Sequence, residues 1–290
     1  MESHIPVLLE ESMAALAVKA GGRYVDGTFG RGGHSREIAR RGGTVLGIDR
    51  DDAAVESAAR MGEAGVKVAK GNHGDLRRIA NENGWNEVDG VLLDLGVSSP
   101  QLDDAGRGFS FQREGPLDMR MDRSAGVTAA DIVNGEGAER LEEIFRTLGE
   151  EPQARRVAKS IVAARAEGRR FETTTDFADF VARIVGRHGA HHPATRVFQA
   201  LRMAVNDEMG ELERALEGGL ALLSHGGYDQ SPPRPPFIPF SHNQGQLHPA
   251  VVVKAFDVLH HHQEQVPLRL PVVGVFEHFR PALDLIEDRR

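Results

Sequence analysis

The stretch "YVDGTFGRGGHS", residues 24–35, gathers the residue types of a ligand-binding turn. It holds four glycines between Asp26 and His34: Gly27, Gly30, Gly32 and Gly33. Glycines let a ligand approach the backbone closely, and a helix that begins here offers N–H groups that have no partner within the helix. The turn therefore predicts a site for a nucleotide-type cofactor, although a tight turn without any ligand could have the same composition.

A second acidic residue, Asp49, ends the next apolar segment, "GTVLGID". An acid at this point of a nucleotide-binding fold accepts hydrogen bonds from ribose hydroxyls. The alternative for Asp49 is a capping role at the start of the helix that follows in "DRDD".

Nicotinamide dinucleotides and S-adenosylmethionine both fit such a turn. The spacing "DGTFGRGG" differs from the G-x-G-x-x-G of dinucleotide sites. An acid before the first glycine suits the cationic amino group of the methionine part of S-adenosylmethionine. The sequence therefore favours a methyltransferase over an oxidoreductase.

The stretch "LLDLGVSSPQLDD" places Asp94 at the end of an apolar run, with Ser98, Ser99 and Gln101 shortly after it. An exocyclic amine is a poor nucleophile because its lone pair is delocalised into the ring. Acceptors that hold the amine protons let the nitrogen turn pyramidal and face a methyl donor in line, and such positioning lowers the barrier. Asp94 and Ser98 are therefore candidate catalytic residues. In the alternative interpretation, Asp94 only binds the cofactor and the serines cap a turn.

The elements that must position these residues alternate along the first hundred residues. Apolar segments predict strands, and the stretches between them predict helices. The strands are expected at 23–26, 43–49, 65–71 and 88–96, and the helices at 34–41 and 51–62. This alternation predicts an α/β fold with a parallel sheet, whose ligands lie at the carboxyl ends of the strands.

The pattern changes after Gln101. Residues 102–122 predict an ordered loop over the site, and helices are expected at 137–149, 152–168 and 173–189, with one or two more in 193–223. Pro152 is expected in the first turn of its helix. We therefore predict a cofactor-binding domain at 1–102 and 209–290, with a helical domain inserted at 103–208.

Composition restricts the chemistry further. The chain has 290 residues, a net charge of −8 and no cysteine, which excludes disulfides and cysteine nucleophiles, among them the thiolate used in carbon-5 methylation of cytosine. The first residues, "MESHIPVLLEES", lack the features of a signal peptide, and no apolar stretch approaches the roughly 18 residues of a membrane helix. We expect a cytoplasmic protein without a membrane anchor or a metal site.

The motifs together identify a resemblance. The blocks "YVDGTFGRGGHS", "GIDRD", "LLDLGVSSPQLDDAGRGFSF", "GPLDMRMD" and "HPATRVFQALRMAVN", from His4 to about Gly227, resemble the bacterial 16S ribosomal RNA cytosine-N4 methyltransferases. The resemblance implies a Rossmann-like S-adenosylmethionine-dependent methyltransferase sheet with an inserted helical domain. It also implies N4-methylation of a cytosine in the decoding centre of 16S rRNA, with the small ribosomal subunit as partner.

The resemblance also implies the cofactor contacts. They fall on Gly32, Gly33, His34, Asp49, Asp94 and Gln101, and on His73, where the family often has phenylalanine. An RNA partner calls for basic surface, and residues 152–202 contain ten Lys/Arg against four Asp/Glu. The inserted domain is therefore predicted to recognise RNA.

The chain departs from the family after Gly227. The run "GGYDQSPPRPPFIPFSHNQGQLHP" is rich in proline, which cannot serve in a central strand, although strands could still form in "AVVVKAFDVL" and "RLPVVGVFEHF" after it. A second hypothesis follows: a catalytically impaired relative that binds RNA or the ribosome. The short histidine run at 260–262 is interpreted as incidental. The sequence leaves the oligomeric state open.

Overall fold

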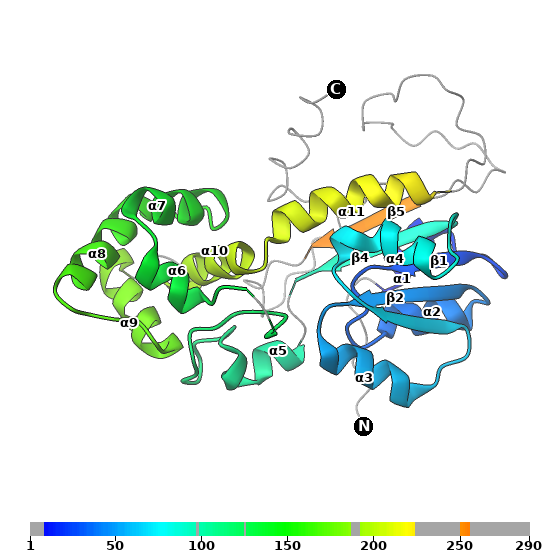
Figure 1. Ribbon diagram of the computed structural model, residues 1–290, viewed down its shortest axis with the longest axis horizontal. Helices are drawn as coiled ribbons and strands as arrows, with labels where there is room; N and C mark the ends of the chain where they lie inside the picture. Colours follow the sequence, from blue (N-terminus) through cyan, green and yellow to red (C-terminus); the bar gives the residue numbers. More distant parts are fainter. Residues whose placement is uncertain (1–8, 97–98, 125, 187–191, 224–249, 256–290) are drawn as a thin grey trace, which may run out of the picture. The chain divides into compact units, whose positions relative to one another are not determined.

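The computed structural model describes residues 9–96, 99–124, 126–186, 192–223 and 250–255 (Figure 1). The chain divides into two compact units. The first unit contains the described residues up to Leu95 and those from Met209 onward, and the second unit runs from Gly96 to Glu208.

The first unit contains a five-stranded parallel sheet, which confirms the predicted fold class. Its strands are β1 (Arg23–Asp26), β2 (Thr44–Asp49), β3 (Val66–Lys70), β4 (Gly90–Leu95) and β5 (Ala250–Ala255), in the order β3-β2-β1-β4-β5. The sequence predicted the first four strands. Three of them, β1, β2 and β4, are largely buried and read as apolar runs, whereas β3 is only half-buried and includes two lysines.

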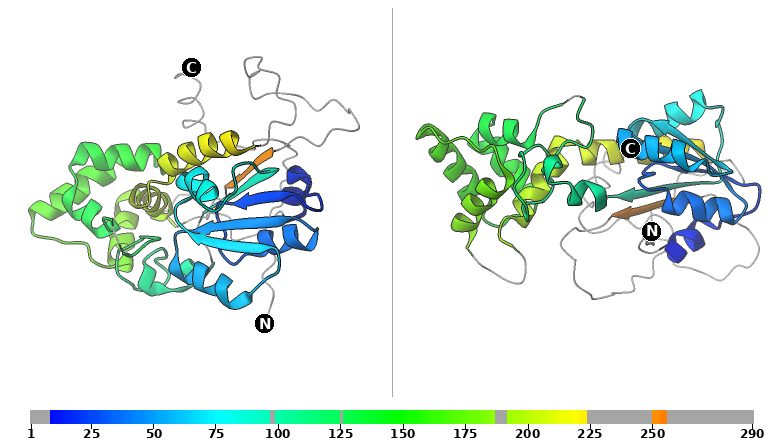
Figure 2. Two further views of the ribbon diagram at one scale, coloured as in Figure 1. Left: turned by 45° about the vertical axis from the view of Figure 1, so that its right-hand side comes forward. Right: turned by 90° about the horizontal axis from the view of Figure 1, so that it is seen from below.

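Helices cover both faces of this sheet (Figure 2). The helices α1 (Leu9–Leu16), α2 (Gly33–Arg40) and α3 (Asp52–Met61) lie on one face, while α4 (Leu76–Glu82) and α11 (Glu208–Leu222) lie on the other. A buried cluster that includes Met13 of α1, Ile38 of α2 and Tyr24 of β1 joins the first face to its helices. The glycine turn and the residues after β2, β3 and β4 consequently meet at the carboxyl edge of the sheet.

The fifth strand, β5, belongs to the stretch after Gly227. Residues 250–255 pair in parallel with 90–95 of β4, from Gly90 opposite Ala250 to Leu95 opposite Ala255. The prolines that argued against a strand lie ahead of this segment, in "SPPRPPFIP" at 231–239, and β5 itself has the β-branched sequence "AVVVKA".

The second unit is helical. Its helices are α5 (Ser99–Asp103), α6 (Ala129–Gly135), α7 (Ala138–Thr147), α8 (Ala154–Ala166), α9 (Thr174–Val185) and α10 (Thr195–Val205). They enclose a core that includes Phe145, Phe171 and Phe177, each fully buried. The stretch 193–223 was predicted to contain one or two helices, and it contains two, α10 and α11. Asp207, with a φ of 47°, separates them.

The predicted start of the helix over 152–168 is wrong. The helix α8 begins at Ala154 with Gln153 as its N-cap, so Pro152 precedes the first turn. A turn ahead of the helix accounts for this difference, because the Ala154 N–H donates to the Glu151 carbonyl and the Gln153 N–H donates to the Glu151 carboxylate.

The segment predicted as an ordered loop, 102–122, has few regular elements. Asn206 fixes it by accepting from the Met121 N–H at 2.9 Å and donating to the Met119 carbonyl at 2.8 Å. Met119 is fully buried with φ 62°, a left-handed backbone that costs a non-glycine residue about 1–2 kcal/mol. The hydrogen bonds of Asn206 help to offset that cost. No helix in the described part of the chain is long and apolar enough to cross a membrane.

Candidate functional site

The first acid of the turn, Asp26, is bound into the protein. It is 1% exposed, and its carboxylate accepts from the Ser35 hydroxyl at 2.6 Å and from the Thr28 N–H at 3.2 Å. Burial raises the pKa of Asp26 to about 6 against these hydrogen bonds, and the charges of Asp94 and Asp49 raise it further. Asp26 therefore ties the turn to the first turn of α2.

The backbone conformation of the turn and the packing of Phe29 beneath it both require glycine. Gly30 and Gly32 have φ values of 53° and 69°, which side chains disfavour. The Phe29 ring fills the space beneath the turn, because a Cβ on Gly32 would lie 2.6 Å from it and a Cβ on Gly47 of β2 would lie 2.5 Å from it. Gly33 is the first residue of α2, and no side chain caps this helix at Gly32. The start of α2 is thus free of side-chain bulk.

Asp49 lies half-buried at the end of β2, beside the turn. Its carboxylate accepts from the Gly30 N–H at 2.7 Å and from the Asp51 N–H at 2.9 Å. The capping role considered for Asp49 belongs to Asp51, whose side chain accepts from the Ala53 N–H at the start of α3. Burial raises the pKa of the Asp49 carboxyl.

The register of the sheet brings three carboxylates to one face. Asp26 is paired with Gly47 on β2 and with Leu92 on β4. Asp49 and Asp94 each lie two residues beyond those partners, and side chains two apart on a strand share a face. The site therefore concentrates negative charge around the first turn of α2.

Asp94 is fixed next to the turn by its backbone. Its N–H donates to the Thr28 hydroxyl at 2.6 Å, and its carboxylate lies 3.6 Å from Nδ1 of His34. The side chain is 28% exposed, so it can meet a ligand, whereas Asp26 cannot. Thr28 was not singled out from the sequence, although it stands within the quoted glycine stretch.

His73 follows β3 and opens the 3₁₀ turn His73–Asp75. It is 8% exposed and lies against the glycine turn, since a Cβ on Gly27 would be 3.3 Å from the His73 Cβ. Burial lowers the pKa of His73 to about 4, and the charges of Arg50 and Arg214 lower it further, so the imidazole is neutral near pH 7.

Glu211 of α11 holds the residues on both sides of His73. Its carboxylate accepts from the Asn72 amide at 3.2 Å and from the Gly74 N–H at 3.1 Å. No motif pointed to Glu211, because its partners lie more than 130 residues away in the chain.

The structure thus gathers Gly32, Gly33, His34, Asp49, His73 and Asp94 within the first unit. Gln101 lies in α5 of the second unit, where it is 7% exposed. Ser98 and the histidines at 260–262 lie outside the described residues.

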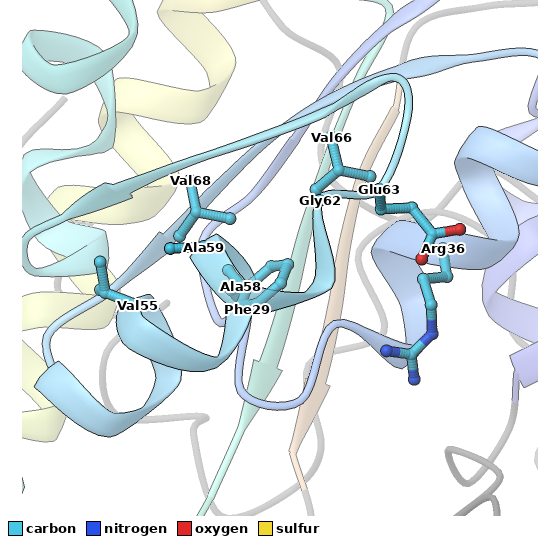
Figure 3. A pocket seen from close by; sticks show the side chains of 9 residues that line it. All are labelled: Phe29, Arg36, Val55, Ala58, Ala59, Gly62, Glu63, Val66 and Val68. Carbon is cyan, nitrogen blue, oxygen red and sulfur yellow. The ribbon is translucent and has the colours of Figure 1, made fainter.

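A separate hollow of about 240 Å³ lies between α3 and β3 (Figure 3). Its walls are largely apolar and include Val55, Ala58, Val66 and Val68, with Phe29 of the glycine turn at one side. None of the three carboxylates lines this hollow.

A parallel sheet with a glycine turn after its first strand, and acids at the ends of the adjacent strands, defines an α/β protein with a nucleotide-type cofactor site. Comparison with known proteins narrows this class. The model of the MraW methylase family matches residues 1–230, and the chain belongs to this family.

Curated relatives agree with this assignment. "Ribosomal RNA small subunit methyltransferase H" from Shewanella woodyi is 44% identical over 276 residues, which cover 93% of this chain and 84% of the relative. The protein of the same name from Shewanella oneidensis gives the same values. Among solved structures, TrmN from Thermus thermophilus aligns with 33% of this chain and 30% of its own, at 23% identity and a TM-score of 0.27. The family model ends close to Gly227, whereas the curated relatives align over a longer part of the chain.

Proposed function

We propose that this chain is an S-adenosylmethionine-dependent methyltransferase that modifies the N4 amine of a cytosine in the decoding centre of 16S rRNA. Membership of the methylase family and the names of the relatives at 44% identity support the reaction and the small-subunit RNA. The observation that carries the proposal is the position of Asp94, an accessible carboxylate fixed beside the glycine turn.

The residues of the first unit fit this cofactor. The bare backbone of Gly32 and Gly33 would hold its amino-acid end, and Asp49 its ribose, while His73 would lie against its nucleoside. Gln101 is a further contact that the family resemblance implies. When bound, S-adenosylmethionine supplies an electrophilic methyl group on a positively charged sulfonium. Three carboxylates on one face of the sheet suit that positive charge.

Asp94 acts on the cytosine amine. Its carboxylate accepts a hydrogen bond from the amine and takes the proton that the nitrogen must lose when it becomes methylated. His34, 3.6 Å away, helps to orient the carboxylate. Ser98 is the second candidate acceptor.

The RNA-binding domain and the cellular location of the reaction form the rest of the proposal. We propose that residues 103–208 form the domain that recognises RNA, and that the reaction takes place in the cytoplasm, where ribosomal RNA is found. The hypothesis of an impaired relative is disfavoured, since β5 adds a strand to the sheet from the region after Gly227 and the relatives align over 93% of the chain.

The test is incubation of the full chain with labelled S-adenosylmethionine and small subunits that lack this methyl group, followed by nucleoside mass analysis. We expect N4-methylcytidine from the wild type and a loss of about 100-fold or more in rate for Asp94→Asn. Asp75→Asn, an exposed carboxylate on the same unit, is the matched control. Label on carbon 5, on ribose or on protein would refute the assignment.

A further inference from the structure

The basic residues of the second unit are not equivalent, and the structure separates those that hold the fold from those that do not. Arg165 donates to the carbonyls of Val133 and Glu136 near the end of α6. Arg202 forms a buried ion pair with Glu208 at 2.8 Å. These two side chains are part of the unit's own structure.

Three further arginines of the ten are also engaged. Arg169 pairs with Asp176 at 2.6 Å and covers two phenylalanine rings. Arg170 pairs with Glu172, and Arg196 donates to the Glu150 carbonyl. The charge counted from the sequence therefore overstates what this unit can offer to a partner.

Of the ten basic residues in 152–202, Arg187 lies outside the described residues. The other four are exposed, with no ion pair to any residue that the structure describes: Arg155, Arg156, Lys159 and Arg183. At 100° per residue, Arg156 and Lys159 lie on the outer face of α8, while Arg155 lies further round the helix. Arg155 borders a hollow lined by three glutamates, Glu142, Glu150 and Glu151, and by one further arginine, Arg146. The carboxylates outnumber the arginines there and offset the charge of Arg155.

Arg183 is an exposed residue in the last turn of α9, and this end of α9 contacts the start of α8. The Gln153 side-chain amide donates to the Val185 carbonyl at 2.8 Å, which brings the end of α9 to the start of α8. The same Gln153 accepts from Arg156 at 3.0 Å. Arg183 lies two residues before Val185, in the last turn of α9, so its backbone is close to the start of α8.

The position of these charges is unfavourable for the helix itself. The first turn of α8 contains no acidic residue, and Arg155 and Arg156 stand near the positive end of the helix dipole. A cation there destabilises a helix, since the dipole favours anions at this end. An external anion would turn this unfavourable arrangement into a favourable one.

We propose that Arg156, Lys159 and Arg183, the α8–α9 basic cluster, bind phosphates of the ribosomal RNA. The inference rests on the proposed function, because the partner it names is the RNA that carries the target cytosine. The cluster supplies affinity that depends on salt, and it takes no part in cofactor binding.

The experiment measures binding of the full-length protein to small ribosomal subunits that lack the methyl group, over a range of salt concentrations. For the triple variant Arg156→Ala, Lys159→Ala, Arg183→Ala we expect weaker binding. The slope of log K against log salt should fall by about 2 in magnitude, since each lost phosphate contact removes about 0.7–0.9. Calorimetric titration of S-adenosylmethionine should give the wild-type affinity, which also shows that the variant is folded.

Two controls make the test specific. The triple variant Arg60→Ala, Lys67→Ala, Arg77→Ala removes the same charge from exposed positions of the first unit. Arg155→Ala removes one charge from α8 next to the glutamates. We expect the first-unit variant to keep the wild-type salt slope, and Arg155→Ala to change it less than Arg156→Ala does.

The outcomes separate the two proposals. An unchanged slope in the α8–α9 variant, or an equal change in the first-unit control, overturns the basic cluster even if the wild type methylates the subunits. Stronger effects on binding to anionic lipid vesicles than on binding to subunits also overturn it. Wild-type protein that binds subunits through the cluster yet forms no N4-methylcytidine leaves the cluster standing and refutes the proposed function.

Discussion

Replacing Asp26 with asparagine should remove a pH-dependent cost from the folded state. The Asp26 carboxyl is 1% exposed, and burial raises its pKa to about 6 from the ordinary 3.8. A shift of about two units corresponds to about 3 kcal/mol, at 1.36 kcal/mol per unit. The sign follows from proton binding, since between the two pKa values the folded state holds a proton that the unfolded state has released. The stability contributed by this group is therefore present at low pH and is lost as the pH rises through about 6.

Urea unfolding of wild type and Asp26→Asn at several pH values between about 4 and 8 measures this effect. The amide can still accept from the Thr28 N–H and donate to the Ser35 hydroxyl, which replaces the bonds of the carboxylate. The free energy of unfolding of the variant should gain about 3 kcal/mol relative to the wild type over this range.

Asp89→Asn is the control of opposite sign. Burial pushes the pKa of Asp89 up, but hydrogen bonds from Lys19 and from the Arg23 N–H outweigh it and leave the pKa lowered. The stability that Asp89 contributes is present above the ordinary pKa of about 3.8 and is lost as the pH falls below it. The Asp89 variant, measured from about pH 3, should therefore lose stability relative to the wild type as the pH rises to about 5, and the difference should then stay constant up to about pH 8. A difference between wild type and Asp26→Asn that stays constant with pH would refute the reasoning.

Two more substitutions test the site and the fold. Asp49→Ala should weaken S-adenosylmethionine binding by about 1–3 kcal/mol in calorimetric titration, because the ribose hydroxyls assigned to Asp49 would lose their acceptor. Unchanged affinity would remove Asp49 from the site. Arg202→Ala should destabilise the protein by about 3–5 kcal/mol in urea unfolding, since it leaves Glu208 as a buried charge without its partner. A loss below about 1 kcal/mol would contradict this, because it would mean that water solvates Glu208 in the variant at little cost.

The sequence predicted the strands well where a continuous apolar run marked them. The apolar runs that became β1, β2 and β4 are buried on both faces, and each was placed within two residues of its bounds. The predictions failed where two neighbouring residues could play the same local role. Two aspartates two residues apart could each cap α3, and only the structure shows that Asp51 does so. Pro152 suits a first turn, but the turn built by Glu151 moved the start of α8 beyond it.

Contacts between distant segments were harder to foresee. Glu211 lies at an unremarkable position on α11, and nothing nearby in the sequence shows that it holds Asn72 and Gly74. Charge counting likewise predicted a basic domain but could not separate Arg202, which is buried with Glu208, from Lys159, which is exposed. Only the structure shows which basic side chains are buried in ion pairs and which are exposed to a binding partner.

The pairing of β5 with β4 has a consequence for how the chain is made. During synthesis, β4 leaves the ribosome about 160 residues before the strand that covers its outer edge. Throughout that interval the nascent sheet ends in a strand with unpaired backbone groups and a continuous apolar sequence, a combination that invites pairing with other chains. The whole second unit is translated within the same interval, so it can fold before β5 has been synthesised. A message cut short before codon 250 would thus yield a protein with a finished helical unit and a permanently open sheet, which chaperones and proteases would meet as an aggregation hazard.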